Sequence, residues 1–227
     1  MHLQMNEGVV TAIVAAIVLP VIAAVARLVW VLPRSPAPVE PNQKLVSSPS
    51  KHVMVFLGSG GHTGEMLRMM GAVNLAAIGQ RTWVTLLGDD ASLVKARNYE
   101  ENLPKDGKVS FVTVARARRV GESLLLSVKS TLQSFVLTAA QFRGLPTLPD
   151  LLLINGPGTL VPIAYILFVF NFVGLGHTKI VYIESLARVS GLSVSGWLLL
   201  PIANRFIVQW PQLQKRFPST EYYGILV

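Results

Sequence analysis

The most informative segment of this chain is Val53-Met54-Val55-Phe56-Leu57-Gly58-Ser59-Gly60-Gly61-His62-Thr63-Gly64-Glu65. Its apolar first part predicts a short buried strand, and its glycines predict a tight turn that leads into a helix beginning near His62. Glycine permits positive φ angles and leaves no Cβ in the path of a ligand, while the start of a helix offers unpaired N–H groups and a partial positive charge. We therefore predict a phosphate-binding turn that comprises Gly58, Ser59, Gly60, Gly61 and Thr63.

Two other interpretations of this stretch stay open. A plain strand-to-helix turn also favours glycine. A dinucleotide-binding turn needs its third glycine where Thr63 stands, and here Gly64 comes one residue later. A membrane-bound nucleotide-dependent reductase, with Asp89 on the cofactor ribose, is therefore an alternative, although the chain has no Tyr-x-x-x-Lys pair to support it.

The composition indicates a protein that meets lipid. Of its 227 residues 51% are hydrophobic and 14% are charged, and the mean hydropathy is +0.49, which is more apolar than a soluble domain requires. The net charge of +8 favours lipid headgroups and phosphate over nucleic acid, because no basic run is interleaved with aromatic residues. There is no cysteine, and the four histidines form no metal-ligand pattern, so we expect neither disulfides nor a metal site.

An apolar run near the N-terminus is long enough to cross a bilayer. Residues 9–26 are apolar apart from Thr11 and Pro20, and the run resumes after Arg27. This exceeds the apolar region of a typical signal peptide. We predict a retained transmembrane anchor over residues 9–32. A cleaved signal sequence is the alternative, but no charged segment precedes the run and no small-residue cleavage site follows it.

The charges around this anchor predict its orientation. Glu7 precedes it, whereas Arg27, Arg34 and Lys44 follow, and positive charge collects on the cytosolic side. The prolines after the anchor cannot continue a helix and predict an extended tether. The expected organisation is a lumenal N-terminus over residues 1–8, a single-pass anchor over 9–32, a proline-rich tether over 33–50 and a cytosolic domain over 51–227.

Strand-like and helix-like segments alternate from residue 51 onward. Strands as apolar as these are buried on both faces, as in a parallel sheet covered by helices. The predicted fold class is α/β, with a doubly wound, Rossmann-like parallel sheet after the transmembrane helix. The predicted strands cover residues 53–57, 83–87, 109–114, 150–154, 179–183 and 205–208, and the predicted helices cover 62–70, 91–98, 124–142 and 160–172.

Two further loops carry residue types that bind phosphate, and both follow predicted strands, where this fold gathers ligands. The first is arginine-rich, and guanidinium binds phosphate oxygens bidentately. The second is another glycine turn at a helix start. A solvated basic loop and a plain turn are the alternative interpretations. The residues are Arg116, Arg118 and Arg119 in the first loop and Asn155, Gly156 and Gly158 in the second.

Three ionisable residues are candidates for a general base: His62, Glu65 and Glu184. A histidine at a helix N-terminus has its pKa lowered by the helix dipole and stays neutral, as a proton acceptor near neutral pH requires. A histidine that only caps the helix is the alternative.

Two more apolar stretches invite a membrane interpretation. Residues 160–173 allow a second span, a buried core helix or an interfacial helix, and we reject the span because it would separate two strands of one sheet. Residues 197–202 form a short apolar patch suited to lying against lipid or guiding a lipid tail.

Taken together, these stretches resemble one family: the membrane-anchoring subunit of the two-subunit UDP-N-acetylglucosamine transferase of dolichol-linked oligosaccharide synthesis. The family is similar to the lipid-acceptor domain of the bacterial transferase that forms lipid II. The resemblance runs from about residue 51 to the end of the chain. It rests on residues 52–66, 116–123, 155–159, 182–185 and 205–211.

This resemblance implies the N-terminal half of a GT-B glycosyltransferase. A soluble catalytic subunit would supply the other half and most of the binding site for the UDP-GlcNAc donor. The chain would hold the dolichyl-diphosphate-GlcNAc acceptor at the cytosolic face of the endoplasmic reticulum membrane, for an inverting transfer of the second GlcNAc. No cofactor is implied, and a requirement for a divalent metal stays open. The family's partner contact would fall on Tyr222, Tyr223, Gly224, Ile225, Leu226 and Val227.

One further alternative belongs to the scaffold class. The chain would then recruit its partner to the membrane without touching any ligand, and variants of the glycine turn would stay active.

Overall fold

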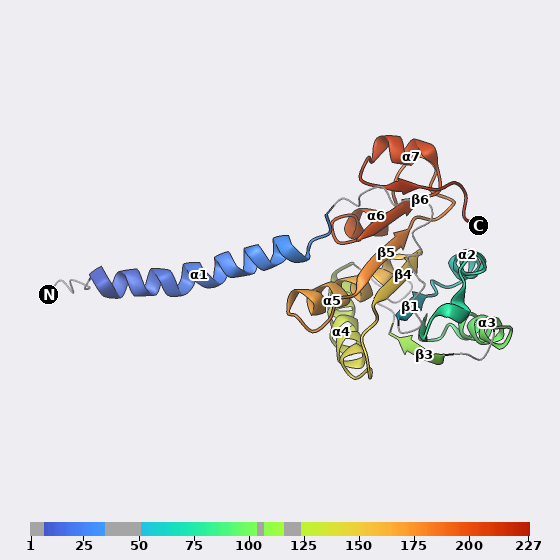
Figure 1. Cartoon of the computed structure of the whole chain (residues 1–227), viewed down its shortest axis with the longest axis horizontal. Helices are drawn as coiled ribbons and strands as arrows, with labels where there is room; N and C mark the ends of the chain where they lie inside the picture. The colour runs from blue at the N-terminus through green and yellow to red at the C-terminus, as the bar shows by residue number, and fades with distance from the viewer. Residues whose placement is uncertain (1–6, 35–50, 104–106, 116–123) are drawn as a thin grey trace. The chain divides into compact units, whose positions relative to one another are not determined.

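The computed structural model describes residues 7–34, 51–103, 107–115 and 124–227 (Figure 1). The predicted diphosphate ligands Arg116 and Arg118, together with Arg119, lie outside the described residues. The chain divides into two compact units, Met1–Leu32 and Pro33–Val227.

The first unit is built on one helix, α1 (Glu7–Val31), which contains Pro20. An 18-residue window of this helix, Val14–Val31, has a mean hydropathy of 2.4, and none of the window is buried inside the protein. Among the described residues it is the one helix long and apolar enough to cross a membrane.

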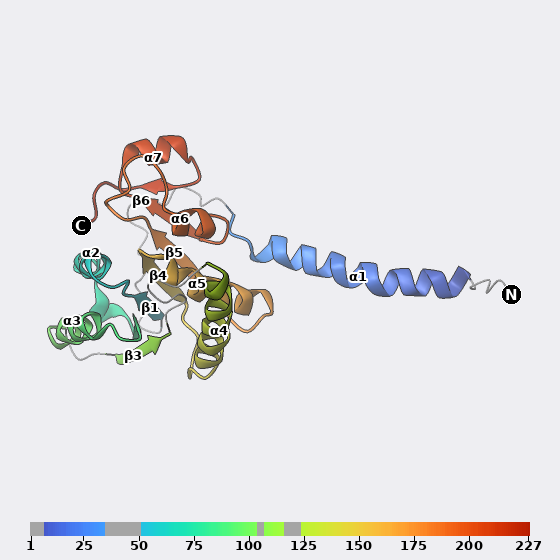
Figure 2. The ribbon, with the colours of Figure 1, turned by 180° about the vertical axis from the view of Figure 1, so that it is seen from behind.

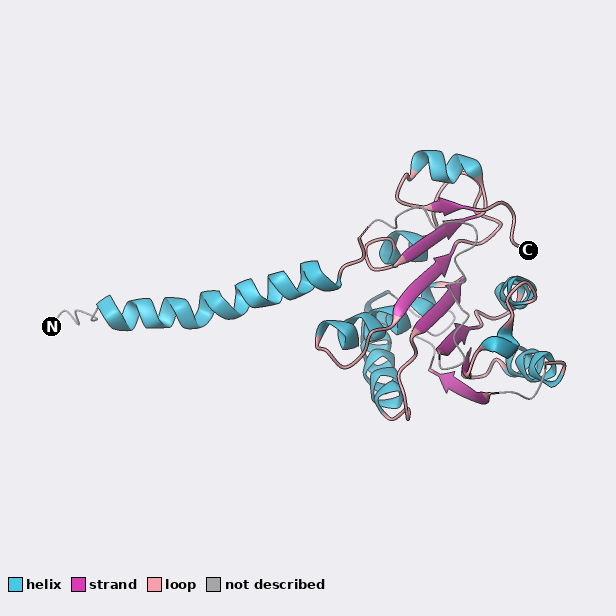
Figure 3. Ribbon diagram, viewed as in Figure 1, coloured by secondary structure: helices cyan, strands magenta, loops and turns pink. Residues whose placement is uncertain are grey.

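The second unit is a seven-stranded sheet in the order β3-β2-β1-β4-β5-β6-β7, and every neighbouring pair is parallel (Figure 3). The predicted Rossmann-like sheet is confirmed. The strand order reverses between β1 and β4, and ligands of such sheets bind beyond the strand ends at this point. The strands are β1 (His52–Phe56), β2 (Gln80–Leu86), β3 (Lys108–Val114), β4 (Leu151–Asn155), β5 (Lys179–Ile183), β6 (Arg205–Val208) and β7 (Glu221–Tyr222).

Helices cover both faces of this sheet. Figures 1 and 2 show α2 and α3 on one face and α4 and α5 on the other. Successive residues of β1 alternate between these layers, so Val53 and Val55 pack with Met66 and Met69 of α2. The helices are α2 (Gly61–Met70), α3 (Asp90–Glu101), α4 (Leu124–Arg143), α5 (Val161–Phe172), α6 (Val194–Leu199) and α7 (Pro211–Arg216), with short 3₁₀ turns at Leu75–Ala77 and Gly158–Leu160.

The apolar segment after the second glycine turn is a core helix. Helix α5 buries Ile163, Ala164, Ile166 and Leu167 in the layer that covers the sheet. This agrees with the core interpretation of residues 160–173 and with β4 and β5 lying in one sheet.

The sequence did not predict β7. This strand pairs with β6, and Arg205 of β6 forms a salt bridge with Glu221 of β7. Beyond it, the Leu226 N–H donates to Gln209 Oε1 over 3.0 Å, and the side chains of Leu226 and Val227 pack against the core on the α2 face. The end of the chain therefore covers part of the sheet, a task that a helix usually performs in this fold.

Candidate functional site

The two glycine turns lie side by side where the strand order reverses. One links β1 to α2, and the other links β4 to α5. A Cβ at Gly58 would stand 2.6 Å from Pro157 Cδ, and a Cβ at Gly156 would stand 2.7 Å from His62 Cγ. Gly156 also has a φ of 111°. Both glycines are therefore required for the turns to pack together.

A hydrogen-bonded group of side chains joins the two turns. His62 Nδ1 lies 3.1 Å from Asn155 Oδ1 and 3.7 Å from Glu65 Oε2. Asn155 Nδ2 donates to Glu65 Oε2 over 3.0 Å, and Ser185 Oγ donates to Glu65 Oε1 over 3.0 Å. The side chains come from α2, from the end of β4 and from the residues after β5.

These contacts determine which nitrogen of His62 carries the proton. An ionised carboxylate only accepts, so the amide group of Asn155 must turn its NH₂ toward Glu65 and its oxygen toward His62. Nδ1 of a neutral His62 must then donate to that oxygen, and Nε2 keeps its lone pair. The side chain of His62 is 34% exposed, and among the described residues Nε2 has no hydrogen-bond partner. His62 is thus oriented to accept a proton from outside.

Asp89, which lies between β2 and α3, holds the first turn in shape. Ser59 has a φ of 52°, and its hydroxyl donates to Asp89 Oδ2 over 2.6 Å. Asp89 is also the N-cap of α3, because its Oδ1 accepts from the backbone N–H of Ser92. These contacts already engage Asp89, which the reductase alternative assigned to a ribose.

The predicted phosphate-binding residues of this turn differ in accessibility. Thr63 is buried, and its hydroxyl lies 2.7 Å from Ser92 Oγ, so it joins α2 to α3. Ideal Cβ positions at Gly60 and Gly61 meet no atom within 4 Å. The open side of the turn therefore lies at Gly60 and Gly61.

Glu184 has a different environment from His62 and Glu65. It is 1% exposed, and its carboxylate accepts from the hydroxyls of Tyr182 and Ser193 and from the backbone N–H groups of Ser185 and Ser193. Burial and the negative charge of Glu184 raise the pKa of Tyr182, so the tyrosine stays protonated as a donor. These contacts favour a structural role for Glu184 and leave His62 and Glu65 as the accessible candidates for proton transfer.

Two residues at the site were not predicted from the sequence. Ser185 orients Glu65, and its position just after β5 was the available signal. Thr159 follows the second glycine turn, and its Oγ1 is the one buried side-chain oxygen or nitrogen of the described residues that lacks a hydrogen-bond partner. A buried hydroxyl without a partner is unfavourable.

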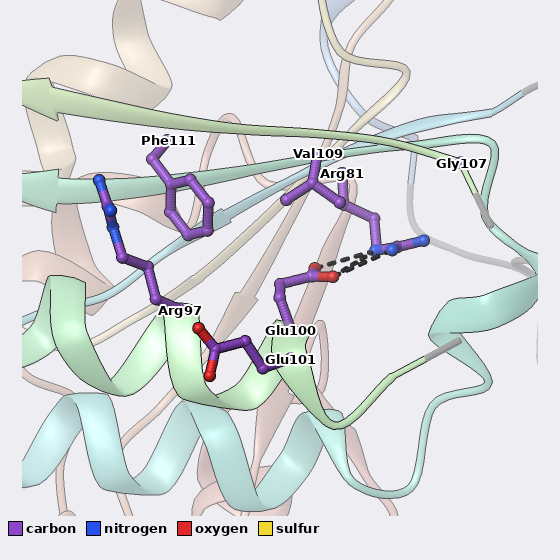
Figure 4. Close-up of a pocket in the computed structure, with 7 residues that line it drawn as sticks. All are labelled: Arg81, Arg97, Glu100, Glu101, Gly107, Val109 and Phe111. Atoms are coloured by element: carbon purple, nitrogen blue, oxygen red, sulfur yellow. Dashed lines mark hydrogen bonds and ion pairs between the residues drawn. The ribbon is translucent and has the colours of Figure 1, made fainter. Parts of the chain in front are cut away.

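A cavity of about 390 Å³ lies elsewhere, between α3 and strands β2 and β3 (Figure 4). It borders the buried ion pair of Arg81 and Glu100, whose Nε and Oε1 are 2.9 Å apart. Arg81 also donates to the carbonyls of Leu75 and Ile78. Because its guanidinium is engaged in holding α3 to the sheet, this cavity is not the candidate site.

Comparison with known proteins identifies relatives. A family model described as "Oligosaccharide biosynthesis protein Alg14 like" matches residues 53–226. A Debaryomyces hansenii protein, named UDP-N-acetylglucosamine transferase subunit ALG14, is 48% identical over 223 residues, covering 94% of this chain and 96% of its own length. The protein of that name from Candida albicans is 46% identical over 217 residues, covering 94% and 95%. A solved structure, "Crystal structure of LpCGTa in complex with UDP", has a TM-score of 0.41 and 14% identity, covering 59% of this chain and 31% of that chain.

Proposed function

The chain belongs to the Alg14 family of oligosaccharide-biosynthesis proteins, and we propose that it is the membrane subunit of a heteromeric UDP-GlcNAc transferase. In this proposal it anchors a soluble catalytic partner at the endoplasmic reticulum membrane and binds a dolichyl-diphosphate-GlcNAc acceptor. The names of the curated relatives support the transferase assignment. Helix α1 supports the anchor, and the charges that flank it in the sequence favour a domain on the cytosolic face.

The acceptor would lie across the two glycine turns. Helix α2 begins at the first turn, and the 3₁₀ turn Gly158–Leu160 that leads into α5 begins at the second. The start of such a helical segment offers N–H groups and a partial positive charge, which suits a diphosphate. The open side of the first turn at Gly60 and Gly61 admits a bulky phosphate group. In this proposal Arg116 and Arg118 would bind the same diphosphate with their positively charged guanidinium groups.

His62 would act as the general base. The sugar 4-hydroxyl of the acceptor attacks the anomeric carbon of the donor, and its proton passes to Nε2 of His62. The bond from that carbon to the UDP oxygen breaks, and UDP leaves with the electron pair, so the configuration inverts. Asn155 and Glu65 hold the base in the required tautomer. This oriented histidine between two glycine turns is the observation that carries the proposal.

The partner would bring the donor half of the GT-B fold. Contact through Tyr222 to Val227 stays a proposal. Tyr223 and Ile225 are about half exposed, whereas Leu226 packs inward beside a cavity of about 250 Å³ lined by apolar residues of α2 and the sheet. The exposed pair is therefore the better candidate for direct contact.

The test is transfer of labelled GlcNAc from UDP-GlcNAc to a short-chain lipid-diphosphate-GlcNAc acceptor. We would compare this chain alone, the chain with its soluble partner, and Gly60→Val or His62→Gln variants with partner. The proposal is supported if the wild-type pair is active, this chain without its partner is inactive, and both variants lose activity while the partner still co-purifies. This result would indicate an acceptor-binding half-enzyme.

Two other outcomes are informative. Undiminished activity of both variants would reduce the chain to a recruiting anchor. Loss in Gly60→Val but not in His62→Gln would keep acceptor binding and remove the proton-transfer role from His62.

A further inference from the structure

An exposed apolar surface on and beside α6 has no role in the site described above. Four of its side chains are open to solvent: Val189 (42% exposed), Val194 (76%), Trp197 (55%) and Leu198 (48%). Below, these four residues are called the α6 patch. Apolar side chains gathered in this way usually mark a surface that binds something.

Side-chain contacts join the segments that carry the α6 patch. The Trp197 ring packs edge-to-face on Phe217 at the end of α7, with 5.2 Å between ring centroids. The guanidinium of Arg216 lies over the Phe217 ring, with 5.6 Å from its Cζ to the ring centroid, and donates to the carbonyl of Ser190. The loop after β5, helix α6 and the end of α7 are thereby held together.

The exposed charges on the described segments that carry the patch are of one sign. Between Leu151 and Thr220 the only acidic residue is Glu184, which is buried. Arg188, Lys215 and Arg216 are all exposed. Tryptophan and aliphatic side chains with a basic rim and no exposed acid are typical of a protein surface that rests on anionic lipid headgroups.

The patch also lies close to the second glycine turn. A Cβ at Gly158 would stand 4.0 Å from Ser195 Oγ of α6, and Tyr165 of α5 donates to the Leu198 carbonyl over 2.8 Å. In the proposed function, the diphosphate bound at that turn is the headgroup of a lipid and therefore lies at the membrane surface. Because α6 is close to the same turn, α6 would then also lie at the membrane surface.

The chain connects this domain to a helix that can span the membrane. About 20 residues separate α1 from β1, and an extended chain of that length reaches at most roughly 70 Å. The domain of an anchored chain is therefore confined near the bilayer, where a weak surface contact is strongly favoured.

We propose that the α6 patch is a second membrane contact, which seats Val194, Trp197 and Leu198 in the interfacial layer of an anionic bilayer. This contact goes beyond anchoring by α1, because it sets how the domain faces the membrane. Its occupant is lipid, and a protein partner on the same surface is the competing outcome.

The chain contains no cysteine, so a single spin label can be placed cleanly. We would label Val194→Cys and, as a matched control, Val94→Cys, an exposed valine of α3. The full chain would be reconstituted in nanodiscs of phosphatidylcholine with and without phosphatidylserine. The label at 194 should be more accessible to lipid-soluble oxygen than to a water-soluble nickel chelate, and more so with phosphatidylserine. The label at 94 should show the reverse preference.

Equal water accessibility at both positions would overturn the proposal. Shielding of position 194 from both reagents only after the soluble partner is added would assign the patch to protein and also overturn it. Since labelling requires no catalysis, these outcomes are independent of the proposed transferase function.

A second measurement uses activity. Val194→Glu should lower transfer to a long-chain acceptor in bilayers about tenfold and leave transfer to a detergent-dispersed short-chain acceptor unchanged. Val94→Glu should change neither. Equal loss with both acceptors would contradict a membrane role.

Discussion

The two halves of the sheet, which meet between β1 and β4, are stabilised by different means. The half with β2 and β3 holds a buried ion pair, Arg81 with Glu100, and the indole N–H of Trp83 donates to the same carboxylate over 2.6 Å. The ion pair of the half with β5 and β6, Arg205 with Glu221, lies between the two last strands with both side chains partly exposed. The buried acid of this half, Glu184, is held by neutral donors.

This difference assigns separate tasks to the two halves. The first half is tied together by charge and supports the rigid turn at Ser59 through Asp89. In the second half, the stretch between Leu151 and Thr220 has no exposed acidic residue, which suits contact with phosphate and lipid. The site lies on the seam because it needs one glycine turn from each half.

The largest expected effect is on stability in the first half. Glu100→Ala would remove the carboxylate that pairs with the Arg81 guanidinium, which is 2% exposed, and we expect a loss of about 3–5 kcal/mol in the free energy of unfolding. Denaturant unfolding of the full chain in detergent would measure it. Glu101→Ala, an exposed neighbour on the same helix, is the control and should change stability by less than ~0.5 kcal/mol. If both variants lost little stability, the buried ion pair would not be what distinguishes the first half of the sheet from the second.

In the second half, Glu184→Ala should cost about 2–3 kcal/mol, because it removes the acceptor of the Ser185 and Ser193 N–H groups and one acceptor of the buried Tyr182 hydroxyl. The same unfolding measurement applies. Glu184→Gln keeps part of the acceptor and should be milder. A stable but inactive Glu184→Gln protein would instead make Glu184 a participant in catalysis.

At the seam, Gly156→Ala should lower stability by about 1–2 kcal/mol through backbone strain. It should also reduce transfer by roughly 100-fold, since the new Cβ would displace the His62 ring. Unfolding and transfer assays of the reconstituted pair would separate the two effects. Gly61→Ala is the stability control, because its Cβ enters open space and its φ is not positive. Unchanged transfer by Gly156→Ala would mean that the ring position is unimportant.

The smallest expected effect concerns pH. Burial lowers the pKa of His52 below 6.5 and outweighs the backbone hydrogen bonds and the Asp150 charge that raise it. The unfolded chain therefore binds a proton more readily, so the free energy of unfolding should fall as pH drops below 6.5. Unfolding curves above and below this pH would measure the slope. His52→Gln should flatten it, and an unchanged slope would assign the pH dependence to other groups.

Much of the architecture was predictable because its signals are local. Apolar strands between glycine turns and helix patterns predicted six of the seven strands in their chain order, and thus a parallel sheet. Strand β7 was not predicted, because Glu221 and Tyr222 form too short a segment to show the alternation of apolar and polar residues that indicates a strand. Its pairing depends on Arg205, which is distant in sequence.

Neighbouring residues were enough to predict the strand, turn and helix units, the apolar span of α1 and the resemblance to a transferase family. Which of the candidate residues meet depends on how the strands pair. Glu65 and Ser185 are 120 residues apart, and His62 and Asn155 are 93 apart. Their contact depends on β1, β4 and β5 pairing in one register, and the same pairing buries Glu184. Because long-range register is a property of the whole sheet, no local pattern could separate the oriented base from the buried carboxylate.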